Sequence, residues 1–201
     1  MNSTPLRLVV MISGSGSNLQ ALIDAISTGT LNAEIVLVVS NRGKVYGLER
    51  AKNANVPTLY FPLKPYTDAD KPRTEYDADL AERIKAYEPD LVVLAGWMHV
   101  LSGHFLAHFP RKVINLHPAL PGIFNGTDAI ARAYEAYVAG EVIHSGCMVH
   151  YAIPEVDMGD VIVQSLVPLL EDDTLETFEK RMHTEEHKII VQAVRLLANR
   201  R

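Results

Sequence analysis

The sequence has a single cysteine and no excess of positive charge. The first feature excludes an internal disulfide, and the second argues against a protein that binds nucleic acid. Cys147 alone cannot form an internal disulfide, which fits a reducing compartment. The formal net charge is −5, whereas surfaces that bind nucleic acid are usually rich in lysine and arginine. We therefore expect no nucleic-acid partner. A small anionic ligand is compatible with this charge, because backbone amides bind phosphate without charged side chains.

Long hydrophobic runs are also missing. No segment reaches the roughly 20 consecutive apolar residues that a membrane-spanning helix requires. The apolar run 6–12 is short and passes directly into a Ser/Gly loop, without the small-residue cleavage site of a signal peptide. A buried strand explains this run better, so the sequence predicts no membrane association and a cytoplasmic location.

Apolar segments of strand length alternate with amphipathic segments through the first 116 residues. This alternation predicts β-α-β units and a mainly parallel sheet that is buried on both faces. The expected strands are 6–12, 33–40, 57–61, 90–95 and 112–116, the expected helices are 17–28, 46–54 and 74–87, and 68–72 is expected to be a loop.

The pattern changes after residue 140. Segments 143–151 and 161–168 are both strand-like, and the connection 152–160 is too short for a parallel crossover, so we expect an antiparallel pair. A long helix follows, with Thr174 as its N-cap. The predicted fold is an α/β, Rossmann-like, mostly parallel sheet with helices on both faces and an antiparallel C-terminal extension, in a single domain over 1–201.

A glycine-rich loop, Ser13-Gly14-Ser15-Gly16-Ser17-Asn18, joins the first expected strand to the first helix. Glycines let the backbone approach a ligand closely, and the helix N-terminus offers unpaired N–H groups to a phosphate. A tight turn with Ser17 or Asn18 capping the helix explains the loop equally well. A dinucleotide site is less consistent, because Leu19 replaces the third glycine and the second strand ends without an acidic residue.

The fifth expected strand ends in Asn115-Leu116-His117-Pro118. Side chains alternate along a strand, so Asn115 and His117 share one face at the edge where open α/β sheets bind ligands. An amide and an imidazole together suit acyl transfer, because they can stabilise an oxyanion and move a proton. The alternative is that both side chains only satisfy backbone groups at the strand end.

A carboxylate near His117 would raise the pKa of the imidazole. The connection 152–160 offers Asp157, and the residue pattern alone leaves Glu155 and Asp160 as rivals and an ordinary turn as the alternative. Two histidine pairs with i, i+4 spacing, 104/108 and 183/187, suggest a metal, but neither has an adjacent glutamate or an obvious third ligand, so we expect no metal site.

Six motifs occur in the order found in the folate-dependent formyltransferase family, which this sequence resembles over nearly its whole length. Asn-x-His-Pro followed by a later aspartate is shared across that family. The Ser/Gly loop followed by Asn-Leu is more particular to the members that formylate a glycinamide. The motifs are Ile12–Gln20, Ser40-Asn41, Gly47–Ala51, Leu94–Met98, Asn115–Pro118 and Glu155–Gly159.

The resemblance implies an enzyme that moves a formyl group from 10-formyltetrahydrofolate to the amine of phosphoribosylglycinamide, without a metal. It implies that Asn115 and His117 stabilise the formyl oxygen, that His117 also moves a proton, and that Asp157 raises the pKa of His117. The expected partners are these small molecules, and the expected assembly is a monomer or homodimer.

The resemblance also implies the ligand contacts, with phosphate binding in the half at about 1–100 and folate binding and catalysis in the half at about 90–201. It places the ribose phosphate at Gly16, Ser17 and Asn18 and the glycinamide at Glu186. His99 stands where the family usually has an arginine. The implied folate contacts are Arg73, Met98, His99, Val100, Leu101, Asn115, Ile153, Pro154, Glu155, Val156 and Asp157.

Two other functions are consistent with the sequence. A formyltetrahydrofolate hydrolase, or a formyltransferase with another acceptor, would share the same fold and motifs. A phosphate- or folate-binding module without turnover would need only the glycine loop or the folate segments. Intact Asn115, His117 and Asp157 argue against a module that only binds.

Overall fold

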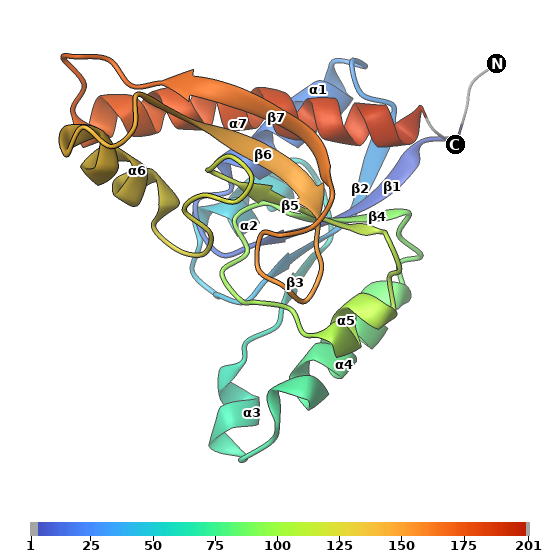
Figure 1. The fold of residues 1–201 in the computed structure, drawn as a ribbon. Helices are drawn as coiled ribbons and strands as arrows, with labels where there is room; N and C mark the ends of the chain where they lie inside the picture. Colours follow the sequence, from blue (N-terminus) through green and yellow to red (C-terminus); the bar gives the residue numbers. More distant parts are fainter. Residues whose placement is uncertain (1–3, 200–201) are drawn as a thin grey trace.

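Seven strands form one sheet in the computed structural model, which describes residues 4–199 (Figure 1). The strand order is β3-β2-β1-β4-β5-β6-β7; the first five strands run parallel, and β6 and β7 are antiparallel to their neighbours. The predicted Rossmann-like sheet with an antiparallel extension is therefore confirmed. The strands are β1 (Leu6–Ile12), β2 (Ala33–Ser40), β3 (Thr58–Tyr60), β4 (Leu91–Leu94), β5 (Val113–His117), β6 (His144–Tyr151) and β7 (Val161–Pro168).

The expected helices form as α1 (Ser17–Ser27), α2 (Tyr46–Asn53), α4 (Arg73–Lys85) and α7 (Leu175–Ala198). Three further helices were not predicted: α3 (Lys64–Asp68), α5 (Gly103–Ala107) and α6 (Ala129–Val138). The first two are too short to show a helical period in the sequence. Helix α6 begins after Asp128 in a left-handed conformation without a side-chain cap, so the usual start signal is missing.

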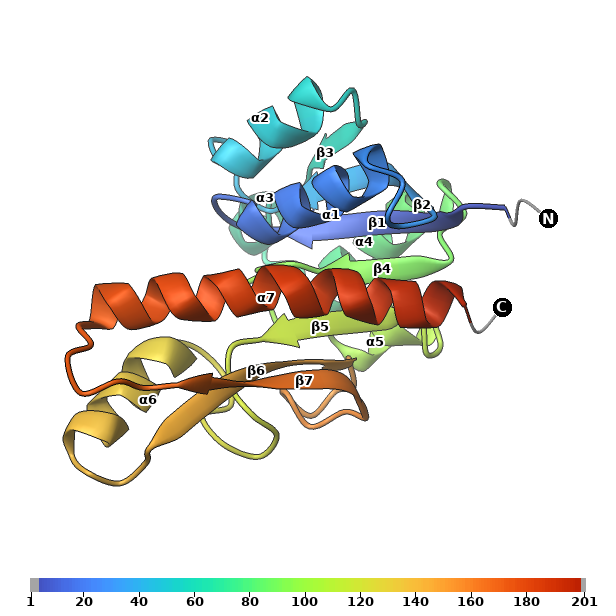
Figure 2. The same ribbon diagram turned by 90° about the horizontal axis from the view of Figure 1, so that it is seen from above.

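Both faces of the sheet are covered by helices, with α1 and α7 on one face and α4 and α5 on the other (Figures 1 and 2). Strand β1 shows why. Leu8, Val10 and Ile12 pack into the core under α1 and α7, whereas Val9 and Met11 pack into the core under α4 and α5. Alternation along the strand thus buries a continuous apolar run on both sides.

Helix α7 carries an apolar stripe across the sheet. Thr174 caps it as expected, accepting a hydrogen bond of 3.2 Å from the Thr177 N–H. Glu186 lies on this stripe between Met182 and Ile189, so its carboxylate is buried among apolar side chains of α7. Despite the length of α7, none of the helices within residues 4–199 is long and apolar enough to cross a membrane.

The loops after β1 and β4 meet where the chain changes direction across the sheet. The Ser13 N–H donates to the Gly96 carbonyl at 2.9 Å, and the Met98 N–H donates to Ser13 Oγ at 2.9 Å. This is the topological switch point, where open α/β sheets bind their ligands.

Candidate functional site

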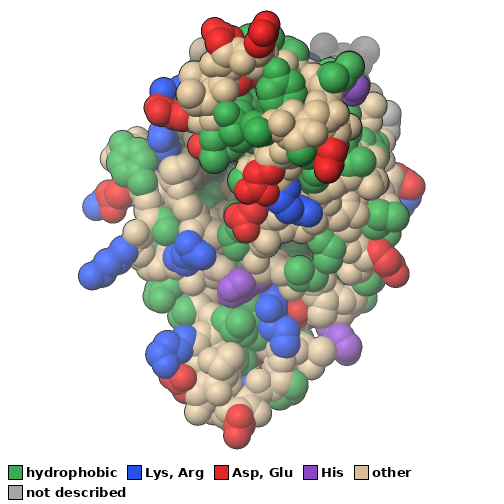
Figure 3. All heavy atoms as spheres, turned by 60° about the vertical axis from the view of Figure 1, so that its left-hand side comes forward, with side chains coloured by type: hydrophobic (Ala, Val, Ile, Leu, Met, Phe, Trp, Pro, Cys, Tyr) green, Lys and Arg blue, Asp and Glu red, His purple; other side chains and the backbone are tan. Residues whose placement is uncertain are grey.

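A cleft of about 850 Å³ opens at the carboxyl ends of β1, β4 and β5. It extends from the glycine loop, past segment 94–101, to β6 and segment 152–157. On this side of the molecule, shown in Figure 3, basic, acidic and histidine side chains are interspersed around a hollowed surface. The size and the mixed lining are typical of a site for small molecules.

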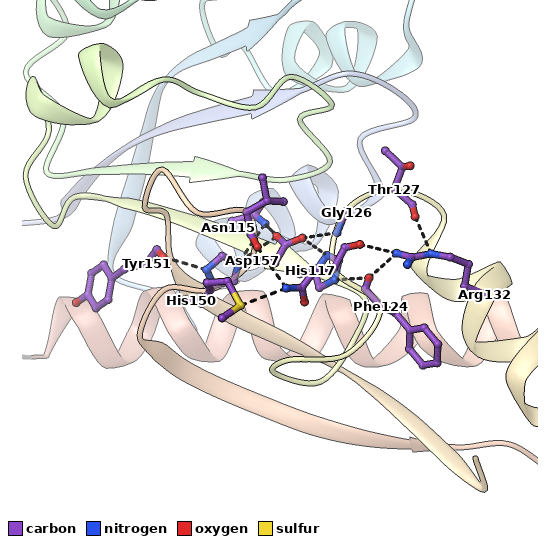
Figure 4. A network of polar contacts seen from close by, with 12 residues as sticks. Asn115, His117, Phe124, Gly126, Thr127, Arg132, His150, Tyr151 and Asp157 are labelled. Atoms are coloured by element: carbon purple, nitrogen blue, oxygen red, sulfur yellow. Dashed lines mark hydrogen bonds and ion pairs between the residues drawn. The ribbon is translucent and has the colours of Figure 1, made fainter. Parts of the chain in front are cut away.

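Asn115, His117 and Asp157, which we call the Asn-His-Asp cluster, lie together in the cleft (Figure 4). Alternation along β5 places the first two on one face of the strand. Asp157 reaches them from the loop after β6, with a left-handed φ of 57°. Its Oδ2 lies 3.3 Å from His117 Nδ1, and its Oδ1 accepts a hydrogen bond of 3.1 Å from Asn115 Nδ2.

The rival carboxylates lie elsewhere. Asp160 is exposed and forms an ion pair of 3.0 Å with Arg111. Glu155 is exposed and is not among the residues that line the cleft. Among the three carboxylates that the sequence offered, Asp157 is therefore the one that contacts His117.

His150 is a member of the site that the sequence analysis missed. It pairs directly with Asn115 across the antiparallel β5–β6 register. Its Nδ1 lies 2.9 Å from the Tyr151 carbonyl, which can only accept, so Nδ1 carries a proton. Its Nε2 lies 3.2 Å from Asn115 Nδ2 and 3.4 Å from Asp157 Oδ1. The sequence analysis paired 143–151 only with 161–168; an antiparallel pairing of 143–151 with 112–116 would have pointed to His150.

Burial and charge shift the pKa of His117 in opposite directions. Burial lowers the pKa below 6.5, while the Asp157 charge and the hydrogen bond to the Phe124 carbonyl raise it, and the net shift is downward. The expected contribution of Asp157 is thus present, but burial outweighs it. Burial also acts to raise the pKa of Asp157, yet contacts with His150, Gly126 and His117 lower it overall. A neutral imidazole therefore faces an ionised carboxylate, which suits it to accept a proton.

The glycine loop approaches α2 so closely that side chains are excluded. Gly16 is the N-cap of α1 with φ 70°, and a Cβ there would lie 2.7 Å from Gly47 Cα. No side chain caps α1, so the alternative of a cap by Ser17 or Asn18 is not realised. Gly16, Ser17 and Asn18 at the start of α1 line the cleft, and the first N–H groups of a helix have no partner within the helix, as a phosphate site requires.

Asn18 and Glu186, which are 168 positions apart in the sequence, meet at the end of the cleft that the glycine loop forms. Asn18 Nδ2 donates to Glu186 Oε2 at 3.2 Å, and His183 Nδ1 lies 2.9 Å from the same oxygen. This hydrogen bond raises the pKa of His183. His183 lines the cleft, but within residues 4–199 no three His, Cys, Asp or Glu side chains are grouped to hold a metal ion.

Apolar side chains are exposed along the other part of the cleft. Met98, Val100, Ile153 and Val156 are between 39% and 60% exposed, although all four line it. Exposed apolar groups inside a cleft are typical of a site for a partly apolar ligand. Leu101 and His99 also line this part, and His99 Nδ1 is buried without a partner.

Three expected folate contacts lie outside the lining of the cleft: Arg73, Pro154 and Glu155. Arg73 instead donates to Asp77 Oδ1 at 3.0 Å and to the Val100 carbonyl at 2.7 Å. Asp77 in turn accepts from the Ser102 N–H at 2.9 Å. Arg73 therefore fixes the segment that presents Val100 to the cleft.

The fold and the site together define a doubly wound α/β protein with a ligand cleft at its switch point and a polar cluster where the last parallel strand meets the antiparallel extension. The sequence matches the formyl transferase family over residues 6–194, and the chain belongs to this family. The predicted class, a transferase of the formyltransferase family, is confirmed.

Proteins of the same family are similar to this chain over nearly their whole length. Phosphoribosylglycinamide formyltransferase of Schizosaccharomyces pombe is 50% identical over 195 residues, covering 93% of this chain and 94% of that protein. The enzyme of the same name from Dictyostelium discoideum is 45% identical, covering 96% and 98%. The crystal structure of glycinamide ribonucleotide transformylase 1 from Symbiobacterium toebii is 42% identical with a TM-score of 0.91, covering 99% and 90%.

Proposed function

We propose that this protein transfers the formyl group of 10-formyltetrahydrofolate to the amine of 5-phosphoribosylglycinamide, in the synthesis of purines. The observation that carries the proposal is the Asn-His-Asp cluster, which lies in the same cleft as a glycine loop at a helix N-terminus. The names of the similar relatives support the choice of acceptor.

The acceptor would bind at the end of the cleft formed by the glycine loop and α7. The first-turn N–H groups of α1, at Ser17 and Asn18, suit the ribose phosphate. Glu186 is 4% exposed and its carboxylate faces the cleft beside Asn18, where it can accept a hydrogen bond from the glycinamide. This arrangement would aim the amine toward His117.

The folate donor would bind against the exposed apolar surface of the cleft. Met98 and Val100 present this surface after β4, and Ile153 and Val156 present it after β6. Burying these side chains against a pterin ring stabilises the complex by about 25 cal/mol for each Å² of apolar area removed from water. The formyl group at N10 would then lie between the folate surface and Asn115.

The reaction needs no covalent enzyme intermediate. The amine nitrogen attacks the formyl carbon, the C=O electron pair moves to oxygen, and an N–H of Asn115 stabilises that charge. Ligand binding must therefore redirect one amide hydrogen that now contacts Asp157 or His150. His117 accepts the proton of the attacking nitrogen. The C–N10 bond then breaks, N10 takes the proton that His117 holds, and a formamide and tetrahydrofolate leave.

The test is turnover of 10-formyltetrahydrofolate, followed by the absorbance of the folate, with and without phosphoribosylglycinamide. The proposal predicts turnover only when the acceptor is present. Turnover without the acceptor would identify a hydrolase. Tight binding of either ligand without turnover would identify a binding protein, or an enzyme for another amine.

A further inference from the structure

Arg132, in the first turn of α6, holds three backbone carbonyls of the loop that precedes it (Figure 4). Its Nη2 donates to the Phe124 carbonyl at 2.7 Å and to the Asn125 carbonyl at 2.6 Å, and its Nε donates to the Thr127 carbonyl at 3.1 Å. A planar guanidinium can satisfy several acceptors at once, which a lysine ammonium cannot do with the same geometry.

The loop needs such support because its backbone is strained. Phe124 and Asp128 have left-handed φ values of 51° and 57°. A left-handed conformation costs a residue with a side chain roughly 1–2 kcal/mol, and it persists only where the surroundings enforce it. Arg132 contacts residues on both sides of Gly126 and thus enforces the conformation of the loop.

The same loop contacts the Asn-His-Asp cluster twice. His117 Nε2 lies 3.1 Å from the Phe124 carbonyl, and the Gly126 N–H donates to Asp157 Oδ2 at 2.8 Å. A carbonyl only accepts, so this contact is a hydrogen bond when the neutral ring carries its proton on Nε2. His117 Nδ1, which faces Asp157, is then the nitrogen that can take a proton.

We propose that Arg132 is a positioning residue that fixes the tautomer of His117. It holds the Phe124 carbonyl, which accepts from both side chains, so that Nε2 donates and Nδ1 stays available beside Asp157. The role of this tautomer in turnover rests on the proposed function. The assignment of the tautomer rests on the contacts alone. Arg132 does not itself belong to the Asn-His-Asp cluster, because within residues 4–199 its side chain hydrogen-bonds to loop backbone and lies over the Phe124 ring.

Arg132→Lys separates the hydrogen-bonding geometry from the charge. The positive charge of Arg132 lowers the pKa of His117, the Phe124 hydrogen bond raises it, and Asp157 and His150 are the other charged or titratable groups that face the ring. Lysine keeps the charge and loses the planar fork. If the loop loosens, the pKa of His117 falls and Nε2 loses its fixed proton.

The experiment uses full-length protein with ¹⁵N-labelled histidine, and reads the two ring nitrogens of His117 by NMR beside kcat and KM. In the wild type, Nε2 should be protonated and Nδ1 bare above the pKa. In Arg132→Lys, the two nitrogen shifts should move toward each other. The kcat should fall on the order of tenfold to a hundredfold, as expected for a displaced reacting group, with KM changing less.

Arg7→Lys is the matched control. Arg7 also donates to two backbone carbonyls, those of Tyr87 and Glu88, but at the opposite end of β1. An equal loss of kcat in both variants, or unchanged His117 shifts in Arg132→Lys, would overturn the proposal. So would a wild-type His117 that is protonated at Nδ1, a result that needs no variant to fold. If no formyl transfer is seen, the shifts still decide the tautomer.

Discussion

Asp157 Oδ2 lies 3.3 Å from Nδ1 of His117, and the two side chains are only 7% and 5% exposed. A charge so close to a buried imidazole stabilises its protonated form, while burial itself stabilises the neutral form. The net shift of the His117 pKa is downward. His117 is therefore neutral near pH 7 in the free protein, and the Asp157 carboxylate stabilises the ring once it takes up a proton.

The pH dependence of turnover tests this balance. Because His117 must be neutral to accept a proton, kcat/KM should rise with pH along an acid limb whose midpoint lies below 6.5, the ordinary value for histidine. Asp157→Asn removes the charge that raises the pKa, so the midpoint should move still lower and kcat should fall. Asp160→Asn, three positions away and exposed, is the control. A midpoint that stays fixed or rises in Asp157→Asn would exclude this role.

Removing the imidazole should nearly abolish turnover. His117→Ala should lower kcat on the order of 10²–10⁴-fold, the usual effect of losing a general acid or base. Steady-state kinetics measure the loss, and circular dichroism checks that the fold is kept. His104→Ala, an exposed histidine on α5, should leave kcat unchanged. If His117→Ala retains more than about a tenth of the wild-type kcat, His117 does not have the central role.

A methyl group on the glycine loop should weaken binding of the acceptor. In Gly16→Ala, the added Cβ meets Gly47 Cα and must displace α1 or α2, so KM for phosphoribosylglycinamide should rise while KM for the folate changes less. Gly29→Ala has the same left-handed backbone, with φ 71° and open space around it. It controls for backbone strain, which costs roughly 1–2 kcal/mol. Equal changes in both KM values in Gly16→Ala would place the phosphate elsewhere.

Glu186→Gln should separate acceptor binding from chemistry. In the wild type, the Glu186 carboxylate accepts a hydrogen bond from Asn18 and raises the pKa of His183. Without this charge, the pKa of His183 should fall and KM for the acceptor should rise. The effect should be larger than that of Glu176→Gln, an exposed residue of α7 paired with Lys180. NMR titration of His183 and saturation kinetics with the acceptor measure the two effects. An unchanged KM would remove Glu186 from the acceptor site.

The alternation of strands and helices was enough to predict the sheet and to place Asn115 and His117 on one face of its fifth strand. Both results depend on local periodicity, which the sequence records directly. The position of Asp157 was not available in this way. Its spacing from His117 left Glu155 and Asp160 equally open, and the choice came from the resemblance to a family.

The contacts through the backbone could not be predicted. The Phe124 carbonyl reaches His117 only because several residues of the loop take left-handed conformations, and Arg132 reaches that loop from a helix without a start signal. Side-chain identity carries little information on such contacts. His150 is different, since pairing 143–151 antiparallel with 112–116 would have brought it beside Asn115.

The fate of a labelled formyl group tests the central claim most directly. The protein is mixed with donor carrying ¹³C in the formyl group and with phosphoribosylglycinamide, and ¹³C NMR follows the label. Direct transfer predicts that the label appears in a formamide on the acceptor, at the rate at which tetrahydrofolate forms, and that this signal is lost in His117→Ala. Label released as formate in the presence of the acceptor would contradict the proposed function.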